Sequence, residues 1–250
     1  MPSASELGES QRRLRRMLAI AVAVIAVLVV LVIVLLTRRG DLGAAPLGPP
    51  AQSSMGVPSA GGPVAVHRTT ALPKPGDYFK GLYPVRFPHT PQGAVAAAAA
   101  MYQYVYTLEP ATAQKVVDVY IAAEDRQVSR ANAVDSVAFF REKMDLPASG
   151  PAPADATIAV QPIGVQWKTV DGDNVYASLD LRIDMLPGNI RPVLSSTAAV
   201  TVHMQWRGDV RSGDWVGLQT PPGKMPAPRF AELDTQEFDT EGWTMIRPGG

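Results

Sequence analysis

The side chains that could do chemistry in this sequence are few and far apart. The histidines are His67, His89 and His203, and there is no cysteine. Histidines with these separations do not have the spacing of a histidine-based metal site, and the lack of cysteine excludes thiolate metal sites and disulfides. No P-loop, dinucleotide-binding, nucleophile-elbow or H-E-x-x-H string occurs. We therefore predict no catalytic residue, no metal ligand and no cofactor-binding residue.

Two groups of carboxylates are the remaining candidates. Asp180, Arg182 and Asp184 alternate with apolar residues and could form a cation site or an ion-pair ladder. The same alternation is typical of a solvated strand face, and we favour that interpretation. Asp171 and Asp173 resemble the beginning of a calcium loop, but the other ligands of the D-x-D-G-x5-E pattern are missing. We expect these two to be turn residues.

His89 lies in the most motif-like stretch of the chain, residues 83–106, which reads YPVRFPHTPQGAVAAAAAMYQYVY. Thr90 suits a helix N-cap, and Pro91 suits the first helical position, where its missing N–H costs nothing. We therefore expect a helix to begin here and His89 to be an exposed or hydrogen-bonded structural residue outside the cap. His203 is expected to be solvated on the polar face of its strand.

The elements that would position these side chains follow from the apolar periodicity. Apolar residues at i, i+3 and i+4 predict three helices, and residues 147–156 form a Pro/Ala/Gly-rich hinge before segments of period two, which predict strands. The helices are expected from Thr90 to a limit set by Pro110, at about 112–123 and at about 129–144. The strands are expected at 157–161, 163–167, 175–185, 200–206 and 215–219.

Helices followed by antiparallel strands are typical of an α+β domain, in which a curved antiparallel sheet wraps a helical layer. The inward positions of two strands carry no ionisable side chain, which favours a non-enzymatic domain over an enzyme with a base in an apolar pocket. These positions are Val175, Ala177, Leu179, Leu181, Ile183, Met185, Val200, Val202, Met204 and Trp206. The tail after Pro226 is expected to pack as an irregular or short helical lid.

A single transmembrane helix is predicted at residues 17–37. Met17–Leu36 has no polar side chain and would be roughly 30 Å long as a helix, which matches the hydrocarbon thickness of a bilayer. Arginines are more numerous before the span than after it, which predicts a cytoplasmic tail at 1–16 and a single-pass protein of the cell membrane. A cleaved signal peptide is the alternative, but its apolar region would be only about 7–15 residues and would end in an A-x-A site.

Residues 38–76 are rich in Gly, Pro, Ala and Ser and are predicted to be a flexible linker. The extracytoplasmic α+β domain would then occupy residues 77–250. That range contains 15 Lys and Arg against 20 Asp and Glu, a net charge of −5. Because this charge repels phosphate backbones, we expect no direct binding of nucleic acid.

The layout of tail, span, linker, helices and antiparallel sheet resembles the bitopic assembly components of type IV secretion and conjugation systems, among them the TcpC-like proteins of Gram-positive plasmids. The string YPVRFPHTPQGAVAAA at 83–98 is similar to a G-F-P-H-T-x-x-G-A-x-x-A-A pattern in uncharacterised actinobacterial proteins of integrative and conjugative elements, with Arg86 in place of the first glycine. The ending of the chain, Glu237-Phe238 and 242–247, is similar to that of the same group.

The resemblance implies that the external domain has a nuclear-transport-factor-2-like cone. It also implies a membrane-anchored structural component of a conjugative transfer or secretion-like complex, which acts through protein–protein contacts outside the cytoplasmic membrane. Its partners would be other membrane proteins of the complex and copies of itself. The alternative is a cell-envelope binding module that captures a small apolar ligand or a wall component in the cone.

Overall fold

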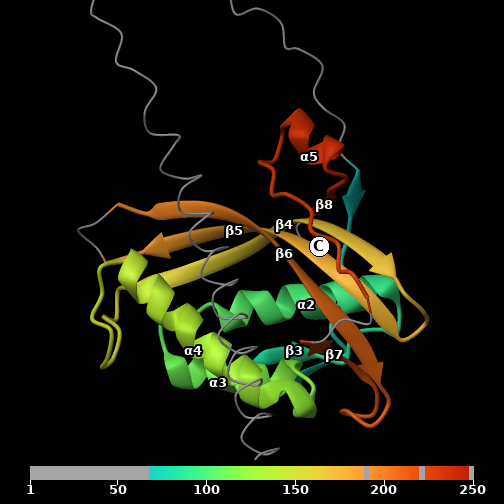
Figure 1. Cartoon of the computed structure of the whole chain (residues 1–250), viewed down its shortest axis with the longest axis horizontal. Helices are drawn as coiled ribbons and strands as arrows, with labels where there is room; N and C mark the ends of the chain where they lie inside the picture. Colours follow the sequence, from blue (N-terminus) through green and yellow to red (C-terminus); the bar gives the residue numbers. More distant parts are fainter. Residues whose placement is uncertain (1–67, 189–191, 220–222, 248–250) are drawn as a thin grey trace, which may run out of the picture. The chain divides into compact units, whose positions relative to one another are not determined.

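The computed structural model describes residues 68–188, 192–219 and 223–247, all of which belong to one unit of the chain (Figure 1). The predicted cytoplasmic tail, the transmembrane helix and the linker up to residue 67 lie outside these ranges. None of the helices within them has both the length and the hydropathy that a bilayer span requires.

The described chain has its three longer helices before its long strands, as the α+β prediction requires. The helices are α2 (Pro91–Val105), α3 (Pro110–Tyr120), α4 (Arg126–Lys143) and α5 (Gln236–Thr240), with a 3₁₀ turn, η2, at Ala123–Asp125. The strands are β1 (Thr69–Thr70), β2 (Asp77–Phe79), β3 (Tyr83–Val85), β4 (Thr157–Thr169), β5 (Asn174–Leu186), β6 (Leu194–Arg207), β7 (Asp214–Leu218) and β8 (Thr244–Ile246).

Six strands form one curved sheet in the order β1-β8-β4-β5-β6-β7, and β2 pairs with β3 in a separate hairpin (Figure 1). Neighbours in the sheet are antiparallel, except that β1 and β8 run parallel. The expected antiparallel sheet is therefore corrected to a mixed one. The parallel pair arises because Thr69 and Thr70, which lie in the segment predicted to be linker, add to the edge formed by the C-terminal strand.

The three longer helices lie on one face of the sheet, which we call the inner face (Figure 1). Helix α2 packs against β4, β5, β6 and β7 and also against β3 and α3, and α4 packs on α3. Because α2 has neighbours on every side, all residues from Gly93 to Met101 are buried, and not only the single stripe that periodicity predicts. Its alanines let the surrounding elements approach the helix axis closely.

The beginnings of the helices follow the capping signals in the sequence. Thr90 Oγ1 accepts a hydrogen bond from the backbone N–H of Gly93 at 3.1 Å, and Pro91 is the first helical residue, so the predicted start of α2 is confirmed. Pro110, which was expected only to limit this helix, is the first residue of α3. The stripe predicted for the third helix is buried, as expected: Ala133, Val137, Phe140 and Met144.

The strands predicted at 157–161 and 163–167 are one strand, β4, with a bulge. The register with β5 shifts between Pro162 and Gly164, so that Ile163 is an extra residue. An extra residue changes the alternation of side chains between the two faces, which is why the sequence reads as two short segments.

The inner face of the sheet agrees with the predicted alternation. On β5 all six predicted inward residues are buried: Val175, Ala177, Leu179, Leu181, Ile183 and Met185. On β6, Val202 and Met204 are buried, whereas Val200 and Trp206 are partly buried against the same core. The main core therefore lies between α2 and the sheet.

The outer face, opposite α2, differs from the prediction. Asp180 on β5 and His203 on β6 were expected to be solvated, but they are buried, with exposures of 0% and 2%. The C-terminal segment packs on this face through a second hydrophobic cluster of Ala231, Phe238 and Trp243. The lid expected from the tail is confirmed, with α5 as its short helix. This lid covers part of a strand face whose alternating polar residues are typical of a face exposed to water.

Candidate functional site

His89 lies between the beginning of α2 and the β4–β5 turn. Its imidazole stacks on the indole of Trp206, with ring centroids 4.2 Å apart and 7° between the ring planes, and it meets Trp215 at 5.6 Å. Its Nε2 is 2.9 Å from Asp173 Oδ1 and 3.1 Å from the backbone oxygen of Gly172. The expected hydrogen bonding of His89 is therefore confirmed, and these contacts join the helix start to the turn.

An imidazole beside a carboxylate is also part of many general-base arrangements. The side chains of His89 and Asp173 are 43% and 59% exposed, and no hydroxyl among the described residues is hydrogen-bonded to this imidazole. Within the described ranges, no group of three or more His, Cys, Asp or Glu is placed to hold a metal ion. The pair therefore has the contacts of a structural cross-link.

Asp171 stabilises the same turn from inside. Its Oδ1 accepts hydrogen bonds from the side-chain amide of Asn174 and the backbone N–H of Asp173, both at 2.9 Å, as expected for a turn residue. These bonds, with that from Asn174 first, lower the pKa of Asp171. Asn174 Oδ1 in turn lies 2.9 Å from Nε2 of His203 and accepts from Gln205 at 3.2 Å, so that the buried histidine supports the turn.

Arg182 and Asp184 lie on the part of β5 that the C-terminal segment leaves open to solvent. Arg182 Nε is 3.2 Å from Asp184 Oδ2, and the Ser195 hydroxyl donates to Asp184 Oδ1 at 2.6 Å. The hydrogen bond from Ser195 is the main reason that the pKa of Asp184 is lowered. The solvated-face interpretation is thus correct for Arg182, and the ladder that would have included Asp180 does not form.

A buried carboxylate, Asp214, holds the segment before α2 in place. Its Oδ2 accepts from the backbone N–H of Arg86 and from Nε of Arg211, each at 2.8 Å. The neighbouring Trp215 donates its indole N–H to the carbonyl of Pro88 at 2.9 Å. No local pattern in the sequence links Asp214 to this segment, which lies more than 100 residues earlier.

The G-F-P-H-T-x-x-G-A-like string has a structural explanation in these contacts. Arg86, at the position of the first glycine, has φ of 59°, a left-handed conformation that glycine adopts without strain. A Cβ on Gly93, at the second glycine, would lie 1.9 Å from the carbonyl oxygen of Pro88. The string therefore specifies a tight corner between β3 and α2.

Asp180 is the buried titratable group that sequence reasoning missed. Its Oδ2 accepts from the backbone N–H of Ala231 at 3.1 Å, and its Oδ1 has no hydrogen-bond partner among the described residues. Burial raises the pKa of Asp180 to about 6, against the opposing effect of hydrogen bonds from the backbone of Ala231 and Leu181. The sequence carries no local signal of this burial, since the small residues that leave room for a cover, Gly164 on β4 and Ala199 on β6, are brought beside Asp180 only by the sheet register.

Residues 229–243, which we call the C-terminal strap, provide that cover. The ring of Phe238 lies over Gly164, where a Cβ would come within 2.8 Å of the ring. Thr235 caps α5 by accepting from the backbone N–H of Phe238 at 3.4 Å. The strap thus places an aromatic ring and the Ala231 N–H over one section of β4 and β5, and it closes the space above Asp180.

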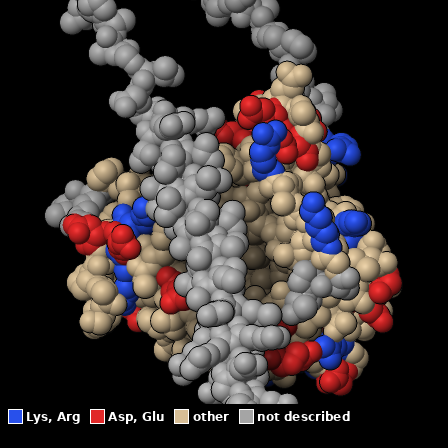
Figure 2. All heavy atoms as spheres, in the orientation of Figure 1, with Lys and Arg blue, Asp and Glu red and all other residues tan. Residues whose placement is uncertain are grey.

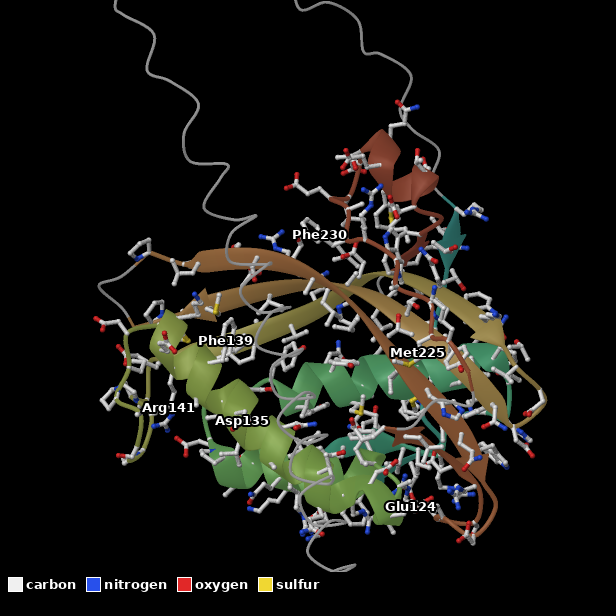
Figure 3. All side chains as sticks on the ribbon, viewed as in Figure 1. Glu124, Asp135, Phe139, Arg141, Met225 and Phe230 are labelled. Atoms are coloured by element: carbon white, nitrogen blue, oxygen red, sulfur yellow. The ribbon has the colours of Figure 1, made fainter. Side chains whose placement is uncertain are left out.

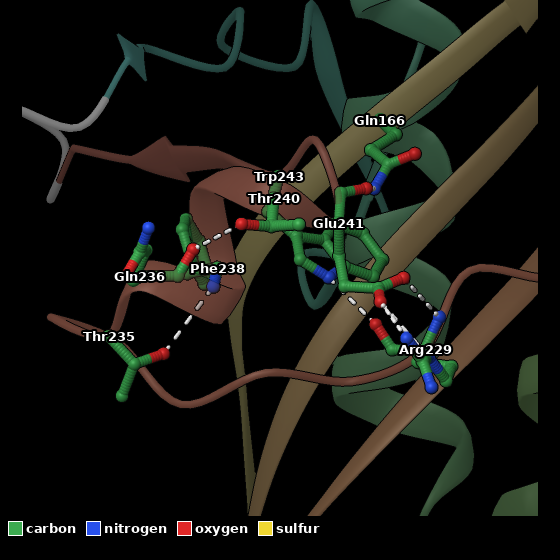
Figure 4. A network of polar contacts seen from close by, with 8 residues as sticks. All are labelled: Gln166, Arg229, Thr235, Gln236, Phe238, Thr240, Glu241 and Trp243. Carbon is green, nitrogen blue, oxygen red and sulfur yellow. Dashed lines mark hydrogen bonds and ion pairs between the residues drawn. The ribbon is translucent and has the colours of Figure 1, made fainter.

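Polar contacts at the C-terminal end of the strap hold it to itself and to β4 (Figure 4). The indole N–H of Trp243 donates to the backbone oxygen of Arg229 at 2.9 Å, and Arg229 pairs with the Glu241 carboxylate at 2.7 Å. Gln166 of β4 donates to the backbone oxygen of Glu241 at 2.7 Å. These contacts close the strap into a loop that lies on the outer face.

An apolar groove of about 210 Å³ opens beside the β2–β3 hairpin. Among its described lining residues, Gln103 is the only one with an amide or charged side chain. The others are Leu72, Pro73, Pro75, Tyr78, Pro84, Phe87, Ala96, Ala99, Ala100, Pro162 and Ile246. Its walls therefore come from the hairpin, α2, β4 and β8, and they offer shape and apolar contact rather than charge.

A family model matches most of the described residues. It is that of a domain of unknown function, DUF8175, and it covers residues 75–244, which include the hairpin, the corner at His89 and Asp180 with its strap. No curated protein and no solved structure matches the chain. Because the matched range is more than half of the sequence, the chain belongs to the DUF8175 family.

Proposed function

We propose that this protein is a membrane-anchored, non-enzymatic structural component of a conjugative transfer or secretion-like complex. In this proposal residues 1–16 are cytoplasmic, residues 17–37 span the membrane, and the folded domain acts outside it. Its partners are other membrane proteins of the complex and further copies of the same chain. The apolar surface around the β2–β3 hairpin is the observation that supports action through protein–protein contacts.

Large apolar side chains are exposed along that hairpin. Tyr78, Phe79 and Leu82 have exposures of 52%, 38% and 51%, and Tyr78 also lines the apolar groove. A single exposed apolar side chain is ordinary, but several beside an apolar groove are typical of a protein-contact surface. The positive φ angles of Lys80 and Gly81 form the tight turn that presents them.

The backbone of the hairpin supports the same interpretation. Within the described residues, β2 pairs only with β3, and all three residues of β2 are exposed. An open strand edge offers N–H and C=O groups to which a strand of another protein can add. The hairpin therefore combines main-chain hydrogen-bonding capacity with apolar side chains.

The buried and hydrogen-bonded titratable groups support the non-enzymatic part of the proposal. His89 joins a turn to a helix start, and Asp214 holds the segment before α2. Asp180 lies beneath the strap, where a substrate would first have to displace Phe238 and its neighbours. Each of these groups has a role in keeping two segments together.

The described fold supports a nuclear-transport-factor-2-like cone as the architecture, because its helices cover one face of a curved sheet. The described fold gives less support to the small-ligand alternative. The residues from Gly93 to Met101 of α2 are buried and fill the inner face of the sheet, where a cone would hold its ligand. The groove is the specific observation in favour of ligand capture, but its volume of about 210 Å³ is below the roughly 300–1,000 Å³ of typical ligand sites. A groove of this size is better suited to side chains of another protein than to a separate small ligand.

The charge distribution supports the absence of nucleic acid among the partners. The range 77–250 has a net charge of −5. Figure 2 shows Lys and Arg side chains beside Asp and Glu on the visible face, and no broad basic patch forms on the described part of that face. A phosphate backbone would gain little from such a surface.

Photo-cross-linking in living cells tests the proposal. A benzophenone amino acid is placed at Leu82 in the full-length protein, and at Val170, which is 44% exposed near the β4–β5 turn, as a matched control. We expect covalent adducts with membrane proteins or with a second copy from position 82, and few or none from position 170. Absence of adducts at 82, together with DNA transfer at the wild-type frequency in a deletion strain, would contradict the proposal.

A further inference from the structure

We infer that the C-terminal strap, residues 229–243, is a proton-controlled cover that holds the outer face of the sheet more tightly in mild acid than at neutral pH, with Asp180 as its sensor. This inference goes beyond the proposed function and does not depend on it. Figure 3 shows Phe230, near the start of the strap, on the side of the sheet opposite α2.

The geometry at Asp180 distinguishes the two protonation states. The side chain is fully buried, one oxygen accepts from the Ala231 N–H of the strap at 3.1 Å, and the other has no partner among the described residues. An ionised carboxylate with an unpaired oxygen loses much of its solvation when it is covered, whereas a neutral carboxyl group loses little. Closure of the strap is therefore opposed by the charge on Asp180.

The surroundings of Asp180 offer its charge backbone hydrogen bonds but no opposite charge. None of the described residues that face it from the neighbouring strands or the strap is titratable. These residues are Gly164 of β4, Ala199 of β6, and Ala231 and Phe238 of the strap. On β5 itself the same face carries Ser178, whose hydroxyl pairs with that of Thr201, and Arg182, which is exposed and paired with Asp184.

The direction of the pH effect follows from these contacts. Burial raises the pKa of Asp180 from an ordinary 3.8 to about 6 when the strap is closed, and an open strap would return the carboxyl group to water. The closed state then binds the proton more tightly. Closure is strongest below the ordinary pKa, weakens as the pH rises towards 6, and above 6 is about a hundredfold less favourable.

A second pair in the strap acts in the opposite direction. The hydrogen bond from Arg229 lowers the pKa of Glu241, so this contact is present at neutral pH and is lost in strong acid. Because the Arg229 side chain is 84% exposed, the pair contributes little. The Asp180 effect therefore dominates, and closure weakens from mild acid to neutral pH.

The strap leads directly into β8, which connects it to the groove. Met245 of β8 packs against the strap cluster, and Ile246 lines the apolar groove. β8 also pairs with β1, which precedes the groove residues Leu72 and Pro73. Loosening of the strap would therefore free the strand that forms one wall of the groove.

Hydrogen exchange of the full-length protein in detergent, followed by mass spectrometry at pH 5.0 and 7.5, tests the inference. After correction for intrinsic exchange rates, we expect strap peptides to be about tenfold better protected at pH 5.0. Peptides from α2 serve as the internal reference and should not show this difference. Equal strap protection at both pH values, or an equal change in α2, would overturn the inference.

Two variants assign the effect to one carboxyl group. Asp180→Asn keeps the shape and the acceptor for Ala231 but is neutral at every pH, so its strap should be well protected at both pH values. Asp184→Asn removes a carboxylate from the same face of the same strand and should keep the wild-type difference. A pH difference that persists in Asp180→Asn would overturn the inference. If that variant does not fold, the wild-type comparison alone decides.

Discussion

Arg141 allows a direct test of how the segment after α4 is held. Its guanidinium is 2% exposed and donates to three backbone oxygens, those of Leu108 at 2.8 Å, Pro147 at 3.0 Å and Gly150 at 2.8 Å. Figure 3 shows Arg141 on α4, close to the loop that follows this helix. The segment 147–156, predicted from its composition to be a hinge, is therefore fastened to α4 and to the beginning of α3.

The magnitude follows from where the three carbonyls lie. A hydrogen bond from a charged group contributes about 1.5–3 kcal/mol, and a buried acceptor left without a donor costs about 1–3 kcal/mol. Arg141→Met leaves the carbonyl of the buried Leu108 without its donor, whereas the exposed Pro147 and Gly150 can turn to water. We expect a loss of about 3–4 kcal/mol in the free energy of unfolding, a large share of the roughly 5–15 kcal/mol of a typical domain.

Urea denaturation followed by tryptophan fluorescence measures this loss, and hydrogen exchange of residues 147–156 reports the local effect. Arg130→Met is the matched control, because Arg130 lies on the same helix, is 47% exposed and pairs with the Asp118 carboxylate. Such a surface pair contributes at most about 1 kcal/mol. If Arg141→Met lost no more stability than Arg130→Met, or if exchange in 147–156 were unchanged, the reasoning about Arg141 would be refuted.

Three further substitutions test the corner, the outer face and the core. Gly93→Ala should lower the free energy of unfolding by several kcal/mol, because its Cβ would lie 1.9 Å from the Pro88 oxygen. Gly172→Ala, whose Cβ meets open space, should change it by no more than about 0.5 kcal/mol, and equal melting temperatures of the two variants would contradict this. Asp180→Asn should be about as stable as the wild type at pH 4 and more stable by about 3 kcal/mol at pH 7, because the folded pKa of about 6 lies above the ordinary 3.8. Urea titrations that give the same stability difference between variant and wild type at both pH values would contradict this. Leu181→Asp should prevent folding, as judged by circular dichroism, because it buries an unpartnered charge, and a folded variant would mean that the inner face is misassigned.

The inner face of the sheet could be predicted because its cause is local. Residues from Val175 to Met185 alternate without interruption, and a single apolar layer beneath them buries every second side chain. The outer face could not be predicted, because its cover comes from elsewhere in the chain. Ala231, which donates to Asp180, is 51 residues away, and no pattern around β5 indicates that it will return.

His203 illustrates the same limit. As a polar residue between Val202 and Met204 it reads as solvated, and a change to Ala would then have no effect. In the structure it is 2% exposed, its ring lies against Tyr176 with centroids 5.6 Å apart, and it contacts Asn174. Replacing it should therefore destabilise the β4–β5 turn.

The prediction for the alanine-rich helix α2 was wrong for a different reason, because it considered only the apolar periodicity and not the small size of the side chains. Periodicity assigns one buried stripe to α2, but small side chains allow close packing on all sides, and the helix lies between the sheet, the β2–β3 hairpin and α3. The run from Ala96 to Ala100 was itself the signal for a central helix. In β4, by contrast, one extra residue at Ile163 hid a continuous strand, and only the register with β5 reveals it.

The corner before α2 links the most motif-like string of the chain to the proposed contact surface. Arg86 adopts a left-handed conformation that is unfavourable for a residue with a Cβ, and the hydrogen bond from its N–H to the buried Asp214 holds it there. On one side of this corner Pro84 and Phe87 line the groove, and on the other side the alanines of α2 do so. The corner therefore fixes the distance between two walls of the groove. The string would in this way determine the shape that a partner protein meets, which is why its residues are expected to matter for assembly as well as for folding.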